Sequence, residues 1–216
     1  MKKCFALILG CEKYTHKRLM QDLDNFPFEY RYFLGNPELD EPIEDNKIVY
    51  LPCSDNYEYL PIKVRLGIKW IVENIPDVSY IFKTDDDITF NGEKLLTMYR
   101  SQILKKSLDY CGHRIDCIAH FSNHHKGSCE SEVLNHSSLY VPNTIYCSGG
   151  GDFLPSGGGY FLSKKSFDII NNEFDIDKNP FLKNYDQTIY EDVMTGGILN
   201  YFSIFPTQVN IESKVL

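Results

Sequence analysis

Apolar residues recur along the chain with two different spacings, which indicate strands and helices in alternation. Runs rich in aromatic and β-branched residues predict strands at residues 4–9, 28–35, 47–51 and 78–84. Apolar residues at helical spacing predict helices at residues 11–24 and 60–73, the second with Pro61 in its first turn. The order strand, helix, strand, strand, helix, strand is typical of an α/β fold with a largely parallel sheet.

The second half of the chain continues this alternation less regularly. The pattern predicts helices at residues 91–106 and 164–171 and after residue 184, a strand at 160–163 and a last strand at 201–205. With 216 residues, of which 43% are hydrophobic, the chain is long enough for one well-buried core. We therefore expect a single domain that spans residues 1–216.

Charge and composition exclude several classes of protein. A net charge of -8 argues against a general nucleic-acid binder. The sequence has no apolar run long enough for a transmembrane helix, and the apolar run before Gly10 is too short for a signal peptide. The 7 cysteines are odd in number and scattered, which is typical of reduced thiols. These features predict a soluble cytoplasmic protein without a membrane span or a nucleic-acid partner.

The strand predicted at residues 78–84 ends in three consecutive carboxylates, Asp85, Asp86 and Asp87. Adjacent carboxylates repel one another, and Mg²⁺ or Mn²⁺ relieves that repulsion while binding substrate phosphates. Ligands of open α/β sheets bind at the carboxyl ends of the strands, so this acidic tip is a candidate site for a metal-bound diphosphate. A solvated acidic turn or a helix cap is the alternative interpretation of the same residues.

The carboxyl ends of the neighbouring strands supply further candidates for a nucleotide pocket. The loops after Gly10 and Gly35, with Asp55 and Lys63, are expected to surround the nucleotide beside Asp85 and Asp86. Lys63 could equally be a solvated residue of its helix.

Two other segments carry candidate chemistry. Residues 110–136 contain three cysteines and five histidines, but their spacing matches no standard zinc site, so a loop with free thiols is the favoured interpretation. Glycine clusters occur at residues 149–151 and 157–159, where loop flexibility is the simple explanation. After them, Asp186, Glu191 and Asp192 stand at a predicted helix start, where they favour the helix dipole or supply a general base.

Several of these residues occur in an ordered set of short motifs. The set resembles the β-1,3-glycosyltransferase family that includes the Fringe and mucin-core galactosyltransferase branches, and it covers most of the chain. It comprises Asp55-x-Tyr57 with Leu60 and Lys63, Trp70, Tyr80-x-x-Lys83-x-Asp85-Asp86-Asp87, Pro155-Ser156-Gly157-Gly158-Gly159-Tyr160-x-Leu162-Ser163, and Glu191-Asp192-Val193-x-x-Gly196.

The resemblance implies a GT-A-like nucleotide-diphospho-sugar transferase fold. Residues 1–90 would mainly bind the UDP-sugar and residues 91–216 the glycan or glycoprotein acceptor. It further implies that Asp85 and Asp87 bind Mn²⁺ or Mg²⁺ and that Asp192 is the catalytic base, with Glu191 and Asp186 as fallback choices. The acceptor side would be formed by Gly157, Gly158, Gly159, Tyr160 and Glu191.

The sequence departs from the family in two respects. Members usually carry an N-terminal membrane anchor, which this sequence lacks, and a histidine beyond the base usually completes the metal site. Here no histidine follows His136. The expected explanations are that the sequence stops short of that residue, that Gln208 or Asn210 substitutes for it, or that only Asp87 and the diphosphate bind the ion.

The leading hypothesis is a metal-dependent glycosyltransferase that moves a hexose such as Gal, GlcNAc or Glc from a UDP-sugar to an acceptor hydroxyl with inversion. The alternatives are a non-catalytic sugar- or nucleotide-binding module of the same fold, a retaining glycosyltransferase, and a zinc-dependent interaction protein that uses residues 110–136.

Overall fold

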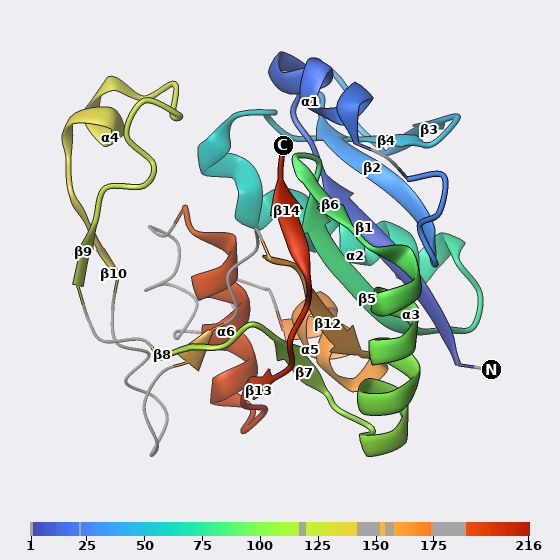
Figure 1. Ribbon diagram of the computed structural model, residues 1–216. Coiled ribbons are helices and arrows are strands. Elements are labelled where there is room, and N and C mark those ends of the chain that lie inside the picture. Colours follow the sequence, from blue (N-terminus) through green and yellow to red (C-terminus); the bar gives the residue numbers. More distant parts are fainter. Residues whose placement is uncertain (1, 22, 117–119, 142–151, 154–157, 174–188) are drawn as a thin grey trace.

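The structure is a computed structural model that describes residues 2–21, 23–116, 120–141, 152–153, 158–173 and 189–216. Its centre is an eight-stranded mixed sheet with the order β13-β7-β12-β5-β1-β2-β4-β3 (Figure 1). Four neighbouring strands are parallel: β5 (Val78–Asp85), β1 (Lys3–Leu9), β2 (Glu29–Gly35) and β4 (Ile48–Leu51). The flanking strands are β12 (Tyr160–Ser163), β7 (Tyr110–Gly112), β13 (Thr207–Gln208) and β3 (Ile43–Asp45).

Helices cover both faces of the sheet. One face packs against α2 (Leu60–Asn74), α5 (Lys164–Glu173) and α6 (Glu191–Tyr201). The other packs against α3 (Gly92–Met98) and η3 (Tyr99–Leu104), a π-helical continuation of α3. From Cys4 to Leu9, strand β1 is apolar at every position because both of its faces are buried. Phe5 and Leu7 pack in the core on the α2 side, whereas Ala6 and Ile8 pack in the core on the α3 side. Burial on both faces is the usual state of a central parallel strand.

The remaining elements lie around this sheet. Residues 120–141, which we call the lobe, contain the antiparallel pair β9 (His120–Ser122) and β10 (Leu139–Val141) with α4 (Glu132–His136) between them. Figure 1 shows the lobe at the left of the molecule, extending away from the sheet. The other short elements are η1 (Glu12–Tyr14), α1 (Thr15–Met20), η2 (Tyr57–Tyr59), β6 (Ile88–Phe90) paired with β14 (Ser213–Val215), and β8 (Ile115–Asp116) paired with β11 (Asp152–Phe153).

The predicted α/β fold, with a mixed and largely parallel sheet flanked by helices, is confirmed. The strand predicted at residues 201–205 is wrong. Tyr201 ends α6, and the amide groups of Phe202 and Ile204 bond back to the carbonyl of Leu199, so the chain turns there instead of extending.

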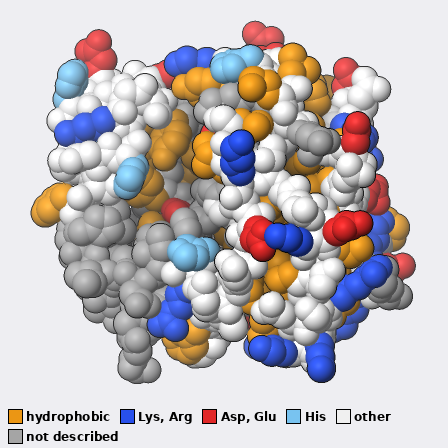
Figure 2. Space-filling model, viewed as in Figure 1, with side chains coloured by type: hydrophobic (Ala, Val, Ile, Leu, Met, Phe, Trp, Pro, Cys, Tyr) orange, Lys and Arg blue, Asp and Glu red, His pale blue; other side chains and the backbone are white. Residues whose placement is uncertain are grey.

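The apolar positions predicted for the first helix also behave differently from expectation. The helix forms over Thr15–Met20, but Leu19 is 80% exposed and Met20 is 64% exposed. Hydrophobic side chains accordingly reach the surface over α1 in Figure 2. The helical spacing that includes these two apolar residues therefore does not correspond to a buried face of the helix.

Among the described residues, no helix combines the length and the apolar character that crossing a bilayer requires.

Candidate functional site

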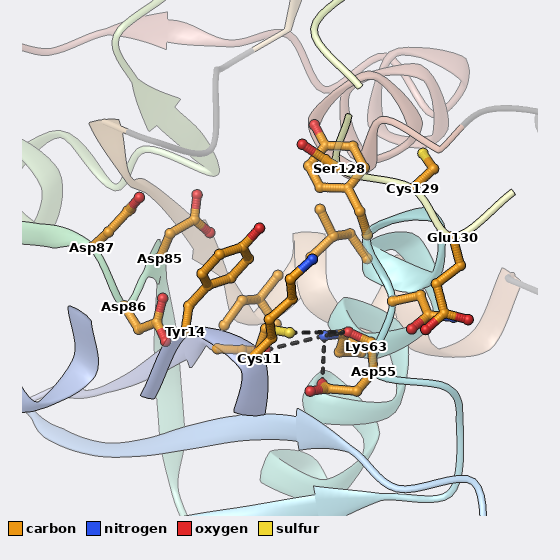
Figure 3. A pocket seen from close by; sticks show the side chains of 16 residues that line it. Cys11, Tyr14, Asp55, Lys63, Asp85, Asp86, Asp87, Ser128, Cys129 and Glu130 are labelled. Atoms are coloured by element: carbon orange, nitrogen blue, oxygen red, sulfur yellow. Dashed lines mark hydrogen bonds and ion pairs between the residues drawn. The ribbon is translucent and has the colours of Figure 1, made fainter. Parts of the chain in front are cut away.

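A cavity of about 430 Å³ opens at the carboxyl ends of β1 and β5. Figure 3 shows Asp85, Asp86 and Asp87 on one side of it and residues 128–130 of the lobe on the other. The volume lies within the range of small-molecule sites. Residues that line it come from the segments after β1, β4 and β5, the start of α2 and the lobe: Leu9, Gly10, Cys11, Lys13, Tyr14, Asp55, Asn56, Tyr57, Leu60, Lys63, Asp85, Asp86, Asp87, Ser128, Cys129 and Glu130.

Asp86 is the most enclosed of the three consecutive carboxylates. Its side chain is 7% exposed, and its Oδ2 atom is buried without a hydrogen-bond partner among the described residues. Burial, together with the charges of Asp85 and Asp87, raises the pKa of Asp86 to about 6. Gly10 allows this placement, because a Cβ atom on Gly10 would lie 2.9 Å from Asp86 Oδ2.

Asp55 and Lys63 connect the loops at the floor of the cavity. Asp55 Oδ1 accepts hydrogen bonds from the backbone amide of Gly35 at 2.7 Å and from Lys63 Nζ at 2.8 Å. Lys63 Nζ also donates to the carbonyl oxygens of Gly10 and Asp55, each at 3.1 Å. The side chain of Lys63 is 1% exposed, so the alternative of a solvated helix residue is wrong.

The carboxylate of Asp85 is paired with a buried lysine. Lys83 Nζ lies 2.7 Å from Asp85 Oδ1 and 2.6 Å from Glu191 Oε1. The hydroxyl of Tyr160 donates to the second oxygen of Glu191 at 2.8 Å. Glu191 is only 2% exposed, and both of its oxygens are engaged inside the protein. This geometry lets Glu191 and Tyr160 support the site from inside the protein, and the acceptor contact expected for them stays a prediction.

Asp192 follows Glu191 in the first turn of α6. Burial, together with the charge of Glu191, raises the pKa of Asp192 to about 7. Its side chain keeps some exposure, and its Oδ1 accepts a hydrogen bond from the backbone amide of Val193. A carboxylate with a pKa near neutrality is suited to accept a proton during a reaction. Asp186, the other fallback base, lies outside the described residues.

The lobe contributes the wall of the cavity that faces the acidic tip. Its position is fixed by His125, which is fully buried, with Nδ1 lying 2.6 Å from the hydroxyl of Tyr190. The Nε2 atom of His125 lies 2.8 Å from the carbonyl oxygen of Leu134, inside the lobe itself. One histidine therefore connects the lobe to the residue directly before Glu191 and Asp192.

The acidic tip suits a hard divalent cation in the chemistry of its donors. The buried, unpartnered Oδ2 of Asp86 and the partly exposed carboxylates of Asp85 and Asp87 provide oxygen atoms beside the cavity. In the described part of the chain, no group of three or more His, Cys, Asp or Glu residues is arranged to bind a metal ion. A site of this kind would therefore depend on one or two carboxylates together with substrate phosphates, as Mg²⁺ sites commonly do.

Neither substitute proposed for the missing histidine is connected to the acidic tip by an observed contact. Gln208 lies in β13, separated from β5 by β7 and β12, and its Oε1 accepts from the backbone amide of Arg114 at 2.7 Å. Asn210 lines a different hollow, together with residues of α3. The C-terminal segment nevertheless returns to the site, because the amide of Leu216 donates to the carbonyl oxygen of Asp87 at 2.8 Å.

The glycine-rich segment is described from Gly158 onward, and Gly157 lies outside the described residues. Gly159 has a φ of +76°, and a Cβ atom there would lie 2.6 Å from the ring of Phe82. This glycine is therefore needed for backbone conformation and packing, whereas Gly158 has open space around it. No observed contact connects either glycine to an acceptor site.

Five of the 7 cysteines lie in the part of the chain that the structure describes. Cys4, Cys11, Cys53, Cys111 and Cys129 are free thiols.

Sequence reasoning missed two features of the site. The sequence motif contains Lys83 but does not predict its ion pair, although the position two residues before Asp85 places both side chains on one face of β5. The second feature is Gln21, whose Nε2 donates to the carbonyl oxygen of Asp85 at 3.2 Å and so supports the acidic loop.

Comparison with known proteins places the chain in a family. Human N-acetyllactosaminide beta-1,3-N-acetylglucosaminyltransferase 2 is 30% identical over 110 residues, which cover 48% of this chain and 25% of that protein. Human beta-1,3-galactosyltransferase 2 is 26% identical over 131 residues, which cover 61% of this chain and 29% of that protein. The chain thus matches little more than a quarter of the length of these relatives.

A solved structure, the 4-diphosphocytidyl-2C-methyl-D-erythritol synthase of Anaerococcus prevotii, superposes with a TM-score of 0.48 at 10% identity, covering 98% of this chain and 88% of that one. That likeness is too distant to bear on function. The sequence profile of the galactosyltransferase family matches residues 38–204, well over half of the chain. The chain therefore belongs to the galactosyltransferase family.

Proposed function

We propose that this chain is a glycosyltransferase that moves a hexose from a UDP-sugar to a hydroxyl group of a glycan or glycoprotein, with inversion at the anomeric carbon. Membership of the galactosyltransferase family supports the reaction class. The observation that carries the proposal is the acidic cavity that Asp85 and Asp87 line, with Lys83 connecting Asp85 to Glu191, the residue directly before the candidate base Asp192.

The donor diphosphate would lie at the acidic tip. Asp87 and Asp85 would bind Mn²⁺ or Mg²⁺, and the ion would neutralise the charge that develops on the departing UDP. The loops carrying Gly10 and Asp55, which Lys63 connects, would form the floor under the nucleotide. An ion is needed there, because a diphosphate would otherwise meet three carboxylates.

Asp192 would take the proton of the acceptor hydroxyl as that oxygen attacks the anomeric carbon. Attack from the side opposite the UDP turns an α-linked donor into a β-linked product. The beta-1,3 linkages in the names of the two human relatives support this stereochemistry. Partial protection of Asp192 from solvent supports its role, because burial keeps its pKa close to the pH at which a base works best.

A donor and acceptor screen tests the proposal. UDP release is measured with UDP-Gal, UDP-GlcNAc and UDP-Glc, with and without Mn²⁺, and with lactosamine-type and galactose-terminated acceptors. We expect release of UDP that depends on both metal and acceptor for at least one pair. Binding of a UDP-sugar without any turnover would instead favour the non-catalytic module, and a product that keeps the donor's anomeric configuration would favour the retaining enzyme.

A further inference from the structure

A lysine ammonium lies inside the protein directly beneath the proposed site. The side chain of Lys83 is 1% exposed, and its strand neighbour Tyr160 lies opposite it in the pairing of β12 with β5. Burying an ammonium costs free energy unless oppositely charged groups surround it. Asp85 at 2.7 Å and Glu191 at 2.6 Å supply those groups.

The two carboxylates belong to different parts of the fold. Asp85 ends β5 at the cavity, whereas Glu191 begins α6 and is separated from Lys83 by 108 residues of sequence. The ammonium of Lys83 lies within ion-pair distance of both carboxylates. Lys83 therefore joins the acidic tip to the first turn of α6.

We propose that Lys83 is a positioning residue, which orients Asp85 toward the donor diphosphate and fixes α6 through Glu191 so that Asp192 meets the acceptor hydroxyl. This inference rests on the proposed function. Glu191 is held on its other side by the hydroxyl of Tyr160, so its carboxylate has a single orientation between β5, β12 and α6. Asp192, the next residue in the same helical turn, takes its position from that orientation.

Electrostatics gives this arrangement a measurable signature. The cation of Lys83 lowers the pKa of Asp192, and the anion of Glu191 raises it. Removing each charge should therefore move the pKa of Asp192 in opposite directions. Among the described residues, the charged groups that act on Asp192 are Glu191, Lys83 and Asp85, and the hydroxyls of Tyr57 and Tyr190 feel its charge in turn.

Two variants test the proposal. Lys83→Met removes the cation, and Glu191→Gln removes the anion while keeping the shape and an acceptor for Lys83. The pKa of Asp192 is measured by ¹³C NMR of the labelled side-chain carboxyl, assigned with Asp192→Asn, and transfer is measured across pH. We expect the pKa of Asp192 to rise in Lys83→Met and to fall in Glu191→Gln. In Lys83→Met, kcat at its pH plateau should fall by about 10- to 100-fold, with a smaller change in the donor KM.

A purely structural ion pair would behave differently. Both variants would then melt at lower temperature, and the pKa of Asp192 would still shift because the neighbouring charges act on it directly. The kcat at the pH plateau would however keep its wild-type value, and that result would overturn the proposal. If Lys83→Met does not fold, Glu191→Gln decides alone through its kcat at the pH plateau, which the proposal expects to fall and a purely structural pair would leave unchanged. The NMR titration needs no donor, so a wild-type protein without transferase activity would refute the proposed function while leaving the effect of Lys83 on Asp192 measurable.

Discussion

The ammonium of Lys63 lies 2.8 Å from the carboxylate of Asp55, and the lysine side chain is almost completely enclosed. This pair connects the start of α2 to the loop after β4, and through the carbonyl of Gly10 it also reaches the loop after β1. Two loops and the start of a helix, all of which line the cavity, thus share one cation.

Replacing Lys63 with Met should therefore destabilise the protein and weaken UDP binding together. Removing one partner of a buried ion pair costs about 3–5 kcal/mol, and the cost here should lie near the lower end because Asp55 keeps the amide donors of Gly35 and Glu12. Urea denaturation and calorimetry with UDP measure the two effects. The control is Lys69→Met in the same helix, where the side chain is 56% exposed and the expected change is below about 0.5 kcal/mol. If the Lys63 variant bound UDP with wild-type affinity, the Lys63–Asp55 pair would have no part in donor binding.

The second prediction concerns the carboxylate assigned to the metal. Asp87→Asn should retain the fold, because Asp87 is partly exposed, and should lower the Mn²⁺-dependent affinity for UDP by about 100-fold, the scale expected when a metal site loses support. Calorimetry with UDP, with and without Mn²⁺, measures the change. Asp40→Asn makes the same change of charge at an exposed position outside the cavity and should bind normally. Equal affinity in the two variants would exclude Asp87 as the ligand.

The third prediction concerns attachment of the lobe. Tyr190→Phe leaves Nδ1 of the buried His125 without its hydroxyl partner, which should cost about 1–3 kcal/mol. A double-mutant cycle with His125→Phe should give a coupling energy of about 1 kcal/mol. Hydrogen exchange should accelerate within the lobe, at the amides of Gly127 and Cys129, before it accelerates in β1 or β5. Additive effects of the two substitutions would show that the contact does not fix the lobe.

The sheet was predictable from the sequence because local patterns determine it. Strand β1 is apolar on both faces, and β5 ends in carboxylates where its burial ends. The short strands β13 and β14 were not predictable in this way, since their pairing with β7 and β6 depends on tertiary contacts.

The chemistry of the site depended on contacts that sequence periodicity does not encode. From the helical spacing alone, the side chain of Lys63 could be either solvent-exposed or buried. Its ion pair with Asp55 shows that it is buried. Likewise, Lys83 becomes an interior cation through Glu191, which lies 108 residues later. The first pair spans a turn between a loop and a helix and the second spans half of the chain, and neither follows a helix or strand spacing.

The last prediction addresses the candidate base. The folded protein raises the pKa of Asp192 to about 7, so the base is protonated below that pH and ionised above it. Transfer should therefore rise with pH through about 7, with kcat falling about tenfold for each unit on the acid side. Asp192→Asn has nearly the same shape but cannot accept the proton. It should bind UDP and Mn²⁺ normally, lower kcat by about 10²–10⁴-fold and lose the rise near pH 7. Steady-state kinetics across pH, with calorimetry on the same preparations, test all three expectations. Near-normal transfer by Asp192→Asn would move the base to another residue, and a rise near pH 7 that survives the substitution would assign that pKa to a different group.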